Sequence, residues 1–259
     1  MNKKIINIFT IAAMGIGSAF GQSAQEKGLE IAKAAEQADL GFKSSTVNIK
    51  MTLKNKNGQT SERLLTTKTF ELTTEGDKSL IVFNSPKDVK GTATLTFTHK
   101  IGSDDQWLFL PSIKRVKRIS SNNKSGPFVG SEFAYEDLSS QEVEKYTYIF
   151  IEEKGSLLTV EQDPVDKKSG YTRRLVTYNK DKGYRIEKVA FYDRKNSLLK
   201  TLTYSDYKTY KNKFWRAGVF NMVNHQTNKE TKLVFSDYNF DANLTEEDFT
   251  QIALKRAGK

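Results

Sequence analysis

The feature that most constrains this chain is a repeated alternation of apolar and polar residues in short segments. In the first such segment, 47–54, every second residue is Val, Ile, Met or Leu, and the residues between are Asn, Lys and Thr. A period of two is the side-chain period of a strand with one buried face and one solvent-exposed face. Asn57-Gly58 follows, a pair typical of hairpin turns, and residues 64–74 supply the returning strand.

The same unit recurs along the rest of the chain, separated by turn-forming pairs such as Ser85-Pro86 and Lys154-Gly155. Connections this short and regular favour an antiparallel meander over a parallel sheet with crossover helices. The further predicted strands are Ser79–Asn84, Thr92–His99, Gln106–Leu110, Lys114–Ile119, Lys145–Glu153, Leu157–Glu161, Tyr171–Asn179, Tyr184–Tyr192, Leu198–Tyr207, Phe214–His225 and Thr231–Tyr238.

Two segments have the composition and apolar spacing of helices. Ala24–Leu40 is rich in Ala, Glu, Lys and Gln with a modest apolar stripe, and Gly41 is placed to end the helix. Thr245–Lys255 resembles a closing helix, with an acidic residue three positions after Thr245 and three apolar residues behind it.

One long segment, Ser120–Gln141, interrupts the meander. It contains Asn, Lys, Gly and Pro, and then aromatic residues among acids. Long connections in compact domains are usually functional or mobile. We interpret this segment as a movable lid, with Phe128 and Phe133 as plugs.

These elements allow few architectures. A long antiparallel sheet either closes into a barrel or curls so that helices cover its concave face. We expect a mainly β protein in which a strongly curved antiparallel half-barrel is covered by helix 24–40 and segment 120–144. Such a sheet encloses an apolar cavity suited to an acyl chain.

The N-terminus predicts export. Lys3 and Lys4 form a short positive region, residues 5–20 carry no charge, and Ala19-Phe20-Gly21 places small residues at a cleavage site before Gln22. The alternative, a membrane anchor, needs about 20 predominantly apolar residues, and this stretch is shorter and interrupted by polar ones. We therefore expect a cleaved signal peptide at 1–21 and a single periplasmic domain at 22–259 that is not an integral membrane protein.

Cleavage lowers the formal net charge from +10 to +8, because two lysines leave with the signal. Export disfavours nucleic acid as the partner for this charge and leaves three alternatives: anionic head groups, an acidic protein surface, or no partner at all. The chain has no cysteine and therefore no disulfide, and at this size a hydrophobic core can supply the stability.

The sequence lacks the usual residues of an enzyme. The only histidines, His99 and His225, lie far apart, each in a predicted strand, which is too few ligands for a zinc site. There is no Gly-x-Ser-x-Gly elbow and no Gly-rich loop before a helix. Adjacent acids such as Glu152-Glu153 are usually a solvated surface, although a carboxylate pair could serve a hydrolase. We expect no catalytic residue, no metal and no cofactor.

Two groups of residues are candidate binding sites. Four cations in five residues, Lys114, Arg115, Lys117 and Arg118, predict a rim or partner-docking surface, or alternatively an edge strand protected by its charges. The apolar and aromatic candidates for cavity lining could equally be ordinary core. They are Val47, Ile49, Met51, Leu53, Phe70, Leu72, Trp107, Phe109, Phe128, Phe133 and Tyr135.

Three segments carry a family likeness: 83–92 (FNSPKDVKGT), 107–119 (WLFLPSIKRVKRI) and 128–138 (FVGSEFAYEDL). In their order and spacing they resemble the LolA-like outer-membrane lipoprotein-sorting proteins, in particular the larger branch associated with RND/MMPL-type transporters. The resemblance implies a bent antiparallel sheet with an apolar cavity for the acyl chains of lipoproteins or for another hydrophobic cargo, and no cofactor.

The resemblance also implies a role and partners. It suggests a carrier that takes cargo from an inner-membrane transporter and passes it to an outer-membrane acceptor. The alternative is a non-catalytic sensor or accessory subunit of a transporter or envelope complex. An envelope hydrolase is the third possibility, which the poor catalytic inventory disfavours.

Overall fold

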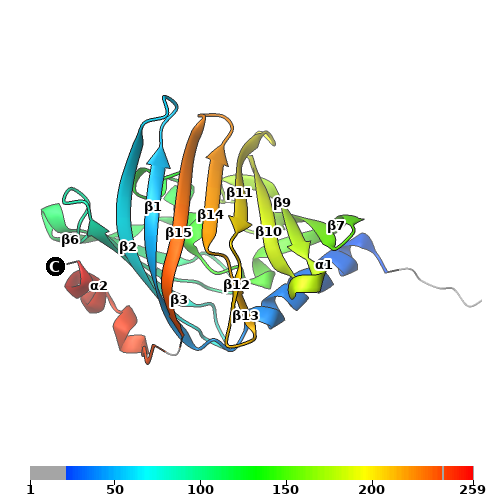
Figure 1. The fold of residues 1–259 in the computed structure, drawn as a ribbon, viewed down its shortest axis with the longest axis horizontal. Coiled ribbons are helices and arrows are strands. Elements are labelled where there is room, and N and C mark those ends of the chain that lie inside the picture. The colour runs from blue at the N-terminus through cyan, green and yellow to red at the C-terminus, as the bar shows by residue number, and fades with distance from the viewer. Residues whose placement is uncertain (1–21, 241, 259) are drawn as a thin grey trace, which may run out of the picture.

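The computed structural model describes residues 22–240 and 242–258, so the predicted signal peptide lies outside the described residues. Most of these residues form one antiparallel sheet of thirteen strands (Figure 1). The strands of this sheet are β1 (Ser44–Lys54), β2 (Thr60–Phe70), β3 (Lys78–Ser85), β4 (Ala93–Phe97), β5 (Asp105–Leu110), β6 (Arg115–Ile119), β7 (Tyr146–Lys154), β8 (Leu157–Pro164), β9 (Tyr171–Asn179), β10 (Arg185–Asp193), β11 (Leu198–Ser205), β14 (Val219–Asn224) and β15 (Lys229–Phe240).

The chain enters this sheet at its middle. β1 pairs with β2 on one side and with β15 on the other, so the first and last strands are neighbours. The full order is β6-β5-β4-β3-β2-β1-β15-β14-β11-β10-β9-β8-β7. Each half is a meander apart from a small β12–β13 hairpin (Lys208–Tyr210 and Phe214–Arg216) between β11 and β14.

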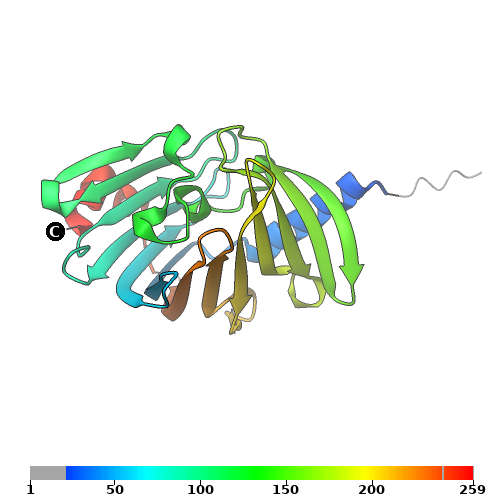
Figure 2. The same cartoon turned by 90° about the horizontal axis from the view of Figure 1, so that it is seen from above.

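Residues 120–145, which we call the crossing segment, join β6 at one edge of the sheet to β7 at the other. The connection must therefore pass over a face of the sheet, and in Figure 2 its green turns run between the two halves. It does so through four short 3-10 turns: η2 (Ser121–Asn123), η3 (Phe128–Gly130), η4 (Tyr135–Leu138) and η5 (Val143–Lys145). The topology explains why this connection is long.

Helix α1 (Ala24–Asp39) lies mainly against β7. Ser23 and Glu26 form a capping box at its start, which satisfies amide groups that have no helical partner. Gly28 is required for its close approach, because a Cβ at this position would lie 2.9 Å from the backbone nitrogen of Phe150. Gly41, with φ of +98°, follows the helix and turns the chain toward β1.

Helix α2 (Gln251–Ala257) covers the opposite face of the sheet, over β4 and β5. It follows the short turn η7 (Glu246–Phe249), and the side chain of Thr250 caps its first turn. Its packing is dense: Phe249 and Leu254 are fully buried among apolar residues of β3, β4 and β5.

The predicted mainly antiparallel sheet with covering helices is confirmed. The β12–β13 hairpin was not predicted, and the segment expected as one strand from 214 to 225 is split by Ala217-Gly218. The sheet is open and is not strongly curled, so the half-barrel stays a prediction.

Candidate functional site

A pocket of about 690 Å³ lies between α1, the crossing segment and the face of the sheet that carries Val47 and Ile49, which we call the inner face. Its lining comes from both halves of the sheet and combines apolar and aromatic residues with nearly as many polar and charged ones. The lining includes Ala32, Ala35, Phe42, Val47, Ile49, Leu72, Ile81, Phe133, Leu138, Tyr148, Tyr178, Ile186, Leu202, Tyr204, Phe220 and Phe235. A concave apolar site with a few polar groups is the usual form of a small-ligand pocket.

Four of the predicted cavity residues line this pocket: Val47, Ile49, Leu72 and Phe133. Met51 and Leu53 lie farther along the same face of β1, where Met51 is buried in the main core and Leu53 packs against it. The alternation in β1 therefore separates an inner face from a wet one, as its period indicates.

Phe70, Trp107 and Phe109 belong to the other face of the sheet. They form the second core with α2, in which Phe70 packs on Phe249 with ring centroids 5.9 Å apart. The parity of their positions explains this placement, since neighbouring residues in a strand point to opposite faces. Apolar character alone did not indicate which face each residue would occupy.

The crossing segment is anchored in the main core. Phe128, Phe133 and Tyr135 are 2%, 5% and 9% exposed, and the Phe128 ring packs on Phe83 with centroids 5.6 Å apart. These aromatic residues are part of the folded core, which does not fit the movable plugs expected from the sequence. The segment is long because of topology, and its burial gives it the role of a fixed cover.

A buried ion pair fixes the same segment to the sheet. The Nζ of Lys200 on β11 lies 2.6 Å from a carboxylate oxygen of Asp137, and both side chains are almost fully buried. Lys200 also donates to the carbonyl of Glu132, and Tyr171 donates its hydroxyl to Asp137. Removing one partner of such a pair leaves an uncompensated charge inside the protein.

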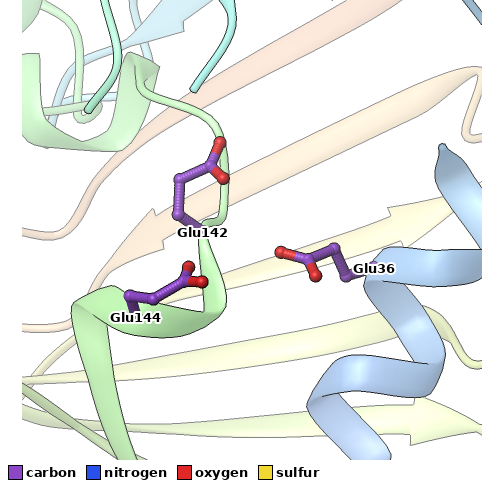
Figure 3. A group of neighbouring side chains, drawn as sticks. All are labelled: Glu36, Glu142 and Glu144. Atoms are coloured by element: carbon purple, nitrogen blue, oxygen red, sulfur yellow. The ribbon is translucent and has the colours of Figure 1, made fainter. Parts of the chain in front are cut away.

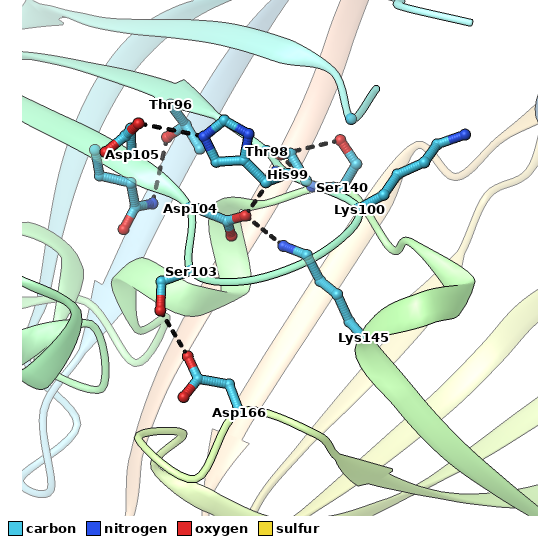
Figure 4. Close-up of polar contacts among 12 residues, drawn as sticks. Thr96, Thr98, His99, Lys100, Ser103, Asp104, Asp105, Ser140, Lys145 and Asp166 are labelled. Carbon is cyan, nitrogen blue, oxygen red and sulfur yellow. Dashed lines mark hydrogen bonds and ion pairs between the residues drawn. The ribbon is translucent and has the colours of Figure 1, made fainter. Parts of the chain in front are cut away.

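The β4–β5 hairpin joins the two ends of the sheet (Figure 4). Lys145, just before β7, pairs with Asp104, and the Ser103 hydroxyl donates to Asp166 beyond β8. Thr98 accepts a hydrogen bond from the backbone of Ser140 in the crossing segment. The edge strands β6 and β7 do not pair with each other, but these polar contacts link the β4–β5 loop to residues next to β7 and β8.

Carboxylates gather along one side of the pocket. Glu36 of α1 and Glu142 and Glu144 of the crossing segment bring oxygens within 4.8 Å of one another (Figure 3). Burial, and then the charge of Glu36, raise the pKa of Glu142 to about 7. Burial, and then the charge of Glu142, raise the pKa of Asp77 to about 7 as well. This is the only group of potential metal ligands in the described part of the chain, and neither histidine belongs to it.

A polar network that the sequence analysis missed lies in the pocket wall. Arg174 of β9 donates from Nε to the Gln162 side chain, which donates to the Tyr178 hydroxyl. The sequence contains a signal for this network. Arg174 shares its strand face with Val176 and Tyr178, so the alternation places a cation among inner residues.

The four predicted rim cations are exposed around β6, an edge strand. Arg118 pairs with Asp105, whereas Lys114, Arg115 and Lys117 have no ion-pair partner among the described residues. Arg118 lies opposite Trp107 and shares the α2 face, whereas Arg115 and Lys117 share the inner face with Ile119. None of the four cations lines the pocket. Within the described residues, no helix is long and apolar enough to cross a membrane.

Comparison with solved structures identifies the family. An outer membrane lipoprotein-sorting protein domain from Vibrio parahaemolyticus is 52% identical, with a TM-score of 0.87 over 90% of this chain and 100% of that chain. The chain belongs to the LolA-like family of outer membrane lipoprotein-sorting proteins. A family model with the description "Uncharacterized protein" also matches residues 75–256 of this LolA-like chain.

Two further structures share the fold of this LolA-like protein. A DUF1329 family protein from Desulfovibrio piger is 25% identical with a TM-score of 0.84, and a LolA superfamily protein from Nitrosomonas europaea is 19% identical with a TM-score of 0.70. Each comparison covers 90% of this chain and 100% of the other. No curated protein matches the chain.

Proposed function

We propose that this LolA-like protein is a non-catalytic periplasmic carrier that holds acyl chains, or another hydrophobic cargo, in the pocket under α1. The pocket is the observation that carries the proposal: about 690 Å³ of space, lined in part by apolar and aromatic side chains, remains between a helix and a sheet. Each methylene transferred from water into such a site gains about 0.8 kcal/mol, so a single acyl chain can be held by apolar contact alone.

The fold supports a carrier in a second way. The signal peptide at 1–21 delivers a mature domain, 22–259, whose sheet, α1 and crossing segment act as a half-barrel around the cargo. The crossing segment is held by the buried Lys200–Asp137 pair, which leaves α1 as the movable wall. Only three of its residues, Gly28, Ile31 and Ala32, are buried, and its other residues are at least partly exposed.

Partners are expected at the exposed cations around β6. An unpaired strand edge with four cations offers backbone groups and charge to an acidic partner, such as an inner-membrane transporter or an outer-membrane acceptor. Because this edge lies away from the pocket, a partner can bind there while cargo is held.

Native mass spectrometry with organic extraction tests the carrier function on the protein purified from its own envelope. We expect a discrete co-purifying lipid, and we expect Ala35→Phe, which fills the pocket from α1, to reduce its amount severalfold. Lys33→Phe, at an exposed position of the same helix, is the matched control and keeps the lipid. A pocket that never carries lipid, together with a stoichiometric protein partner, would favour the sensor function instead.

A further inference from the structure

Arg174 is a buried cation in the pocket wall. It is 6% exposed, and its place on β9 directs it to the inner face with Val176 and Tyr178. Neutral groups hold it: Nε donates to Gln162 Oε1 at 2.8 Å, and the guanidinium lies over the Tyr146 ring, 3.8 Å from its centroid. These contacts fix the plane of the guanidinium, whose terminal nitrogens have no hydrogen-bond partner among the described residues.

No carboxylate pairs with Arg174 among the described residues. The other two arginines of the pocket each have a partner: Arg185 pairs with Glu187, and Arg216 pairs with Asp39. Arg173, the next residue in the chain, points to the other face and pairs with Glu161 at 3.0 Å. The protein thus pairs its neighbouring arginines with acids but supplies none for the most buried one.

An unpaired buried charge is costly, and arginine cannot relieve that cost by losing its proton. An anion that enters the pocket would offset the cost, since two terminal nitrogens of a guanidinium can bind two oxygens of one carboxylate or phosphate. Apolar and aromatic groups such as Leu202 and Tyr204 line the same pocket and would receive a hydrocarbon chain.

We propose that Arg174 binds the anionic group of an amphiphilic cargo, a carboxylate or a phosphate, while the acyl chain occupies the apolar pocket. This inference rests on the proposed carrier function and narrows its cargo class. The pocket also contains carboxylates, including Glu36, Asp137 and Glu142. Arg174 is the only cation of its lining that is buried, and it has no carboxylate partner among the described residues.

Titration of the delipidated full mature chain with palmitate and with hexadecanol tests the proposal, because the two probes differ in charge but share a chain. We expect palmitate to bind the wild type at least about tenfold more tightly, in line with a charge-assisted hydrogen-bonded pair. Arg174→Met removes this preference while hexadecanol binding is kept, and Arg174→Lys restores part of it. Lysophosphatidic acid against monoacylglycerol repeats the comparison for phosphate and shows which anion is preferred.

Arg173→Met is the matched control and keeps the preference, since Arg173 faces away from the pocket. Thermal unfolding checks that Arg174→Met folds; loss of an unpaired buried charge should leave its Tm unchanged or higher. If both probes bind the wild type equally well, or if Arg174→Met keeps the preference, the anion site is refuted and the carrier function stands. If neither probe pair binds, the carrier function itself fails.

Discussion

The two faces of the sheet use helices in different ways. On the outer face, α2 has only seven residues, yet it completes a dry core in which Phe249 and Leu254 are buried with Leu95. On the inner face, the sixteen residues of α1 leave a pocket of about 690 Å³ lined partly by charged groups. The inner face therefore leaves room for a ligand although its helix is more than twice as long as α2.

The largest expected effect is on the outer face. Leu254→Ala empties a fully buried position and should lower the free energy of unfolding by about 2–5 kcal/mol, measured by chemical denaturation. Because α2 does not line the pocket, bound lipid per folded protein should not change. Ile252→Ala, at a position 70% exposed on the same helix, should change stability by less than about 0.5 kcal/mol. Equal effects of the two changes would contradict the dry core.

Gly28→Ala tests how α1 is seated on the inner face. The added Cβ meets the β7 backbone at 2.9–3.1 Å, and backbone cannot yield as a side chain can, so α1 must shift. We expect a net loss of about 1–2 kcal/mol, because overpacking outweighs the gain of up to about 1 kcal/mol in helix propensity. Lipid retention should fall as well, since α1 forms a wall of the pocket. Lys33→Ala is the control, and a more stable Gly28→Ala variant would show that α1 is not closely packed.

Asp77 makes the inner face sensitive to pH. Its folded-state pKa is about 7, whereas an unfolded aspartate titrates near 3.9, so the folded protein keeps a proton that the unfolded chain releases. Its stabilising contribution is complete below about pH 4 and falls as pH rises through 7. Asp77→Asn, neutral throughout, should lose less stability between pH 5 and 8, by on the order of 1 kcal/mol after allowing for partial exposure. Asp181→Asn, at an exposed position, should follow the wild-type profile.

The smallest expected effect on stability comes from the exposed edge. Reversing Arg115 and Lys117 to Glu should change the free energy of unfolding by less than about 0.5 kcal/mol, because both side chains are exposed and unpaired among the described residues. The same double variant should weaken binding to an acidic envelope partner in pull-down experiments at low salt. Reversing Lys56 and Lys232, which are exposed and have no ion-pair partner among the described residues, provides a charge-matched control. Unchanged partner binding would remove β6 as the docking edge.

Local pattern predicted much of the fold, because alternation and turn pairs are short-range signals. It placed β3, β5 and most later strands within one or two residues, began β1 three residues late, and predicted both helices. It could not supply the pairing of β1 with β15, which depends on residues nearly 200 positions apart. Because strand pairing could not be predicted, residues 120–141 were interpreted as a movable lid, whereas the topology requires a long connection there.

The site was predicted less well than the fold. Val47, Ile49 and Phe133 line the pocket, and their role in binding cargo stays a prediction. Phe109 lies on the outer face, because its parity relative to the neighbouring strands could not be predicted. Arg174 was not predicted, because the predicted pocket lining was based on apolar and aromatic residues alone. A cation at an inner position of a strand is a signal that the alternation already contains.

The pairing of β1 with β15 has a consequence for how the pocket comes into being. Val47 and Ile49 on β1 and Phe235 on β15 all line it, so its floor needs both the earliest and the latest strand of the sheet. Contacts so distant along the chain form slowly. The pocket is therefore complete only after the whole sheet has been synthesised and its first and last strands have joined.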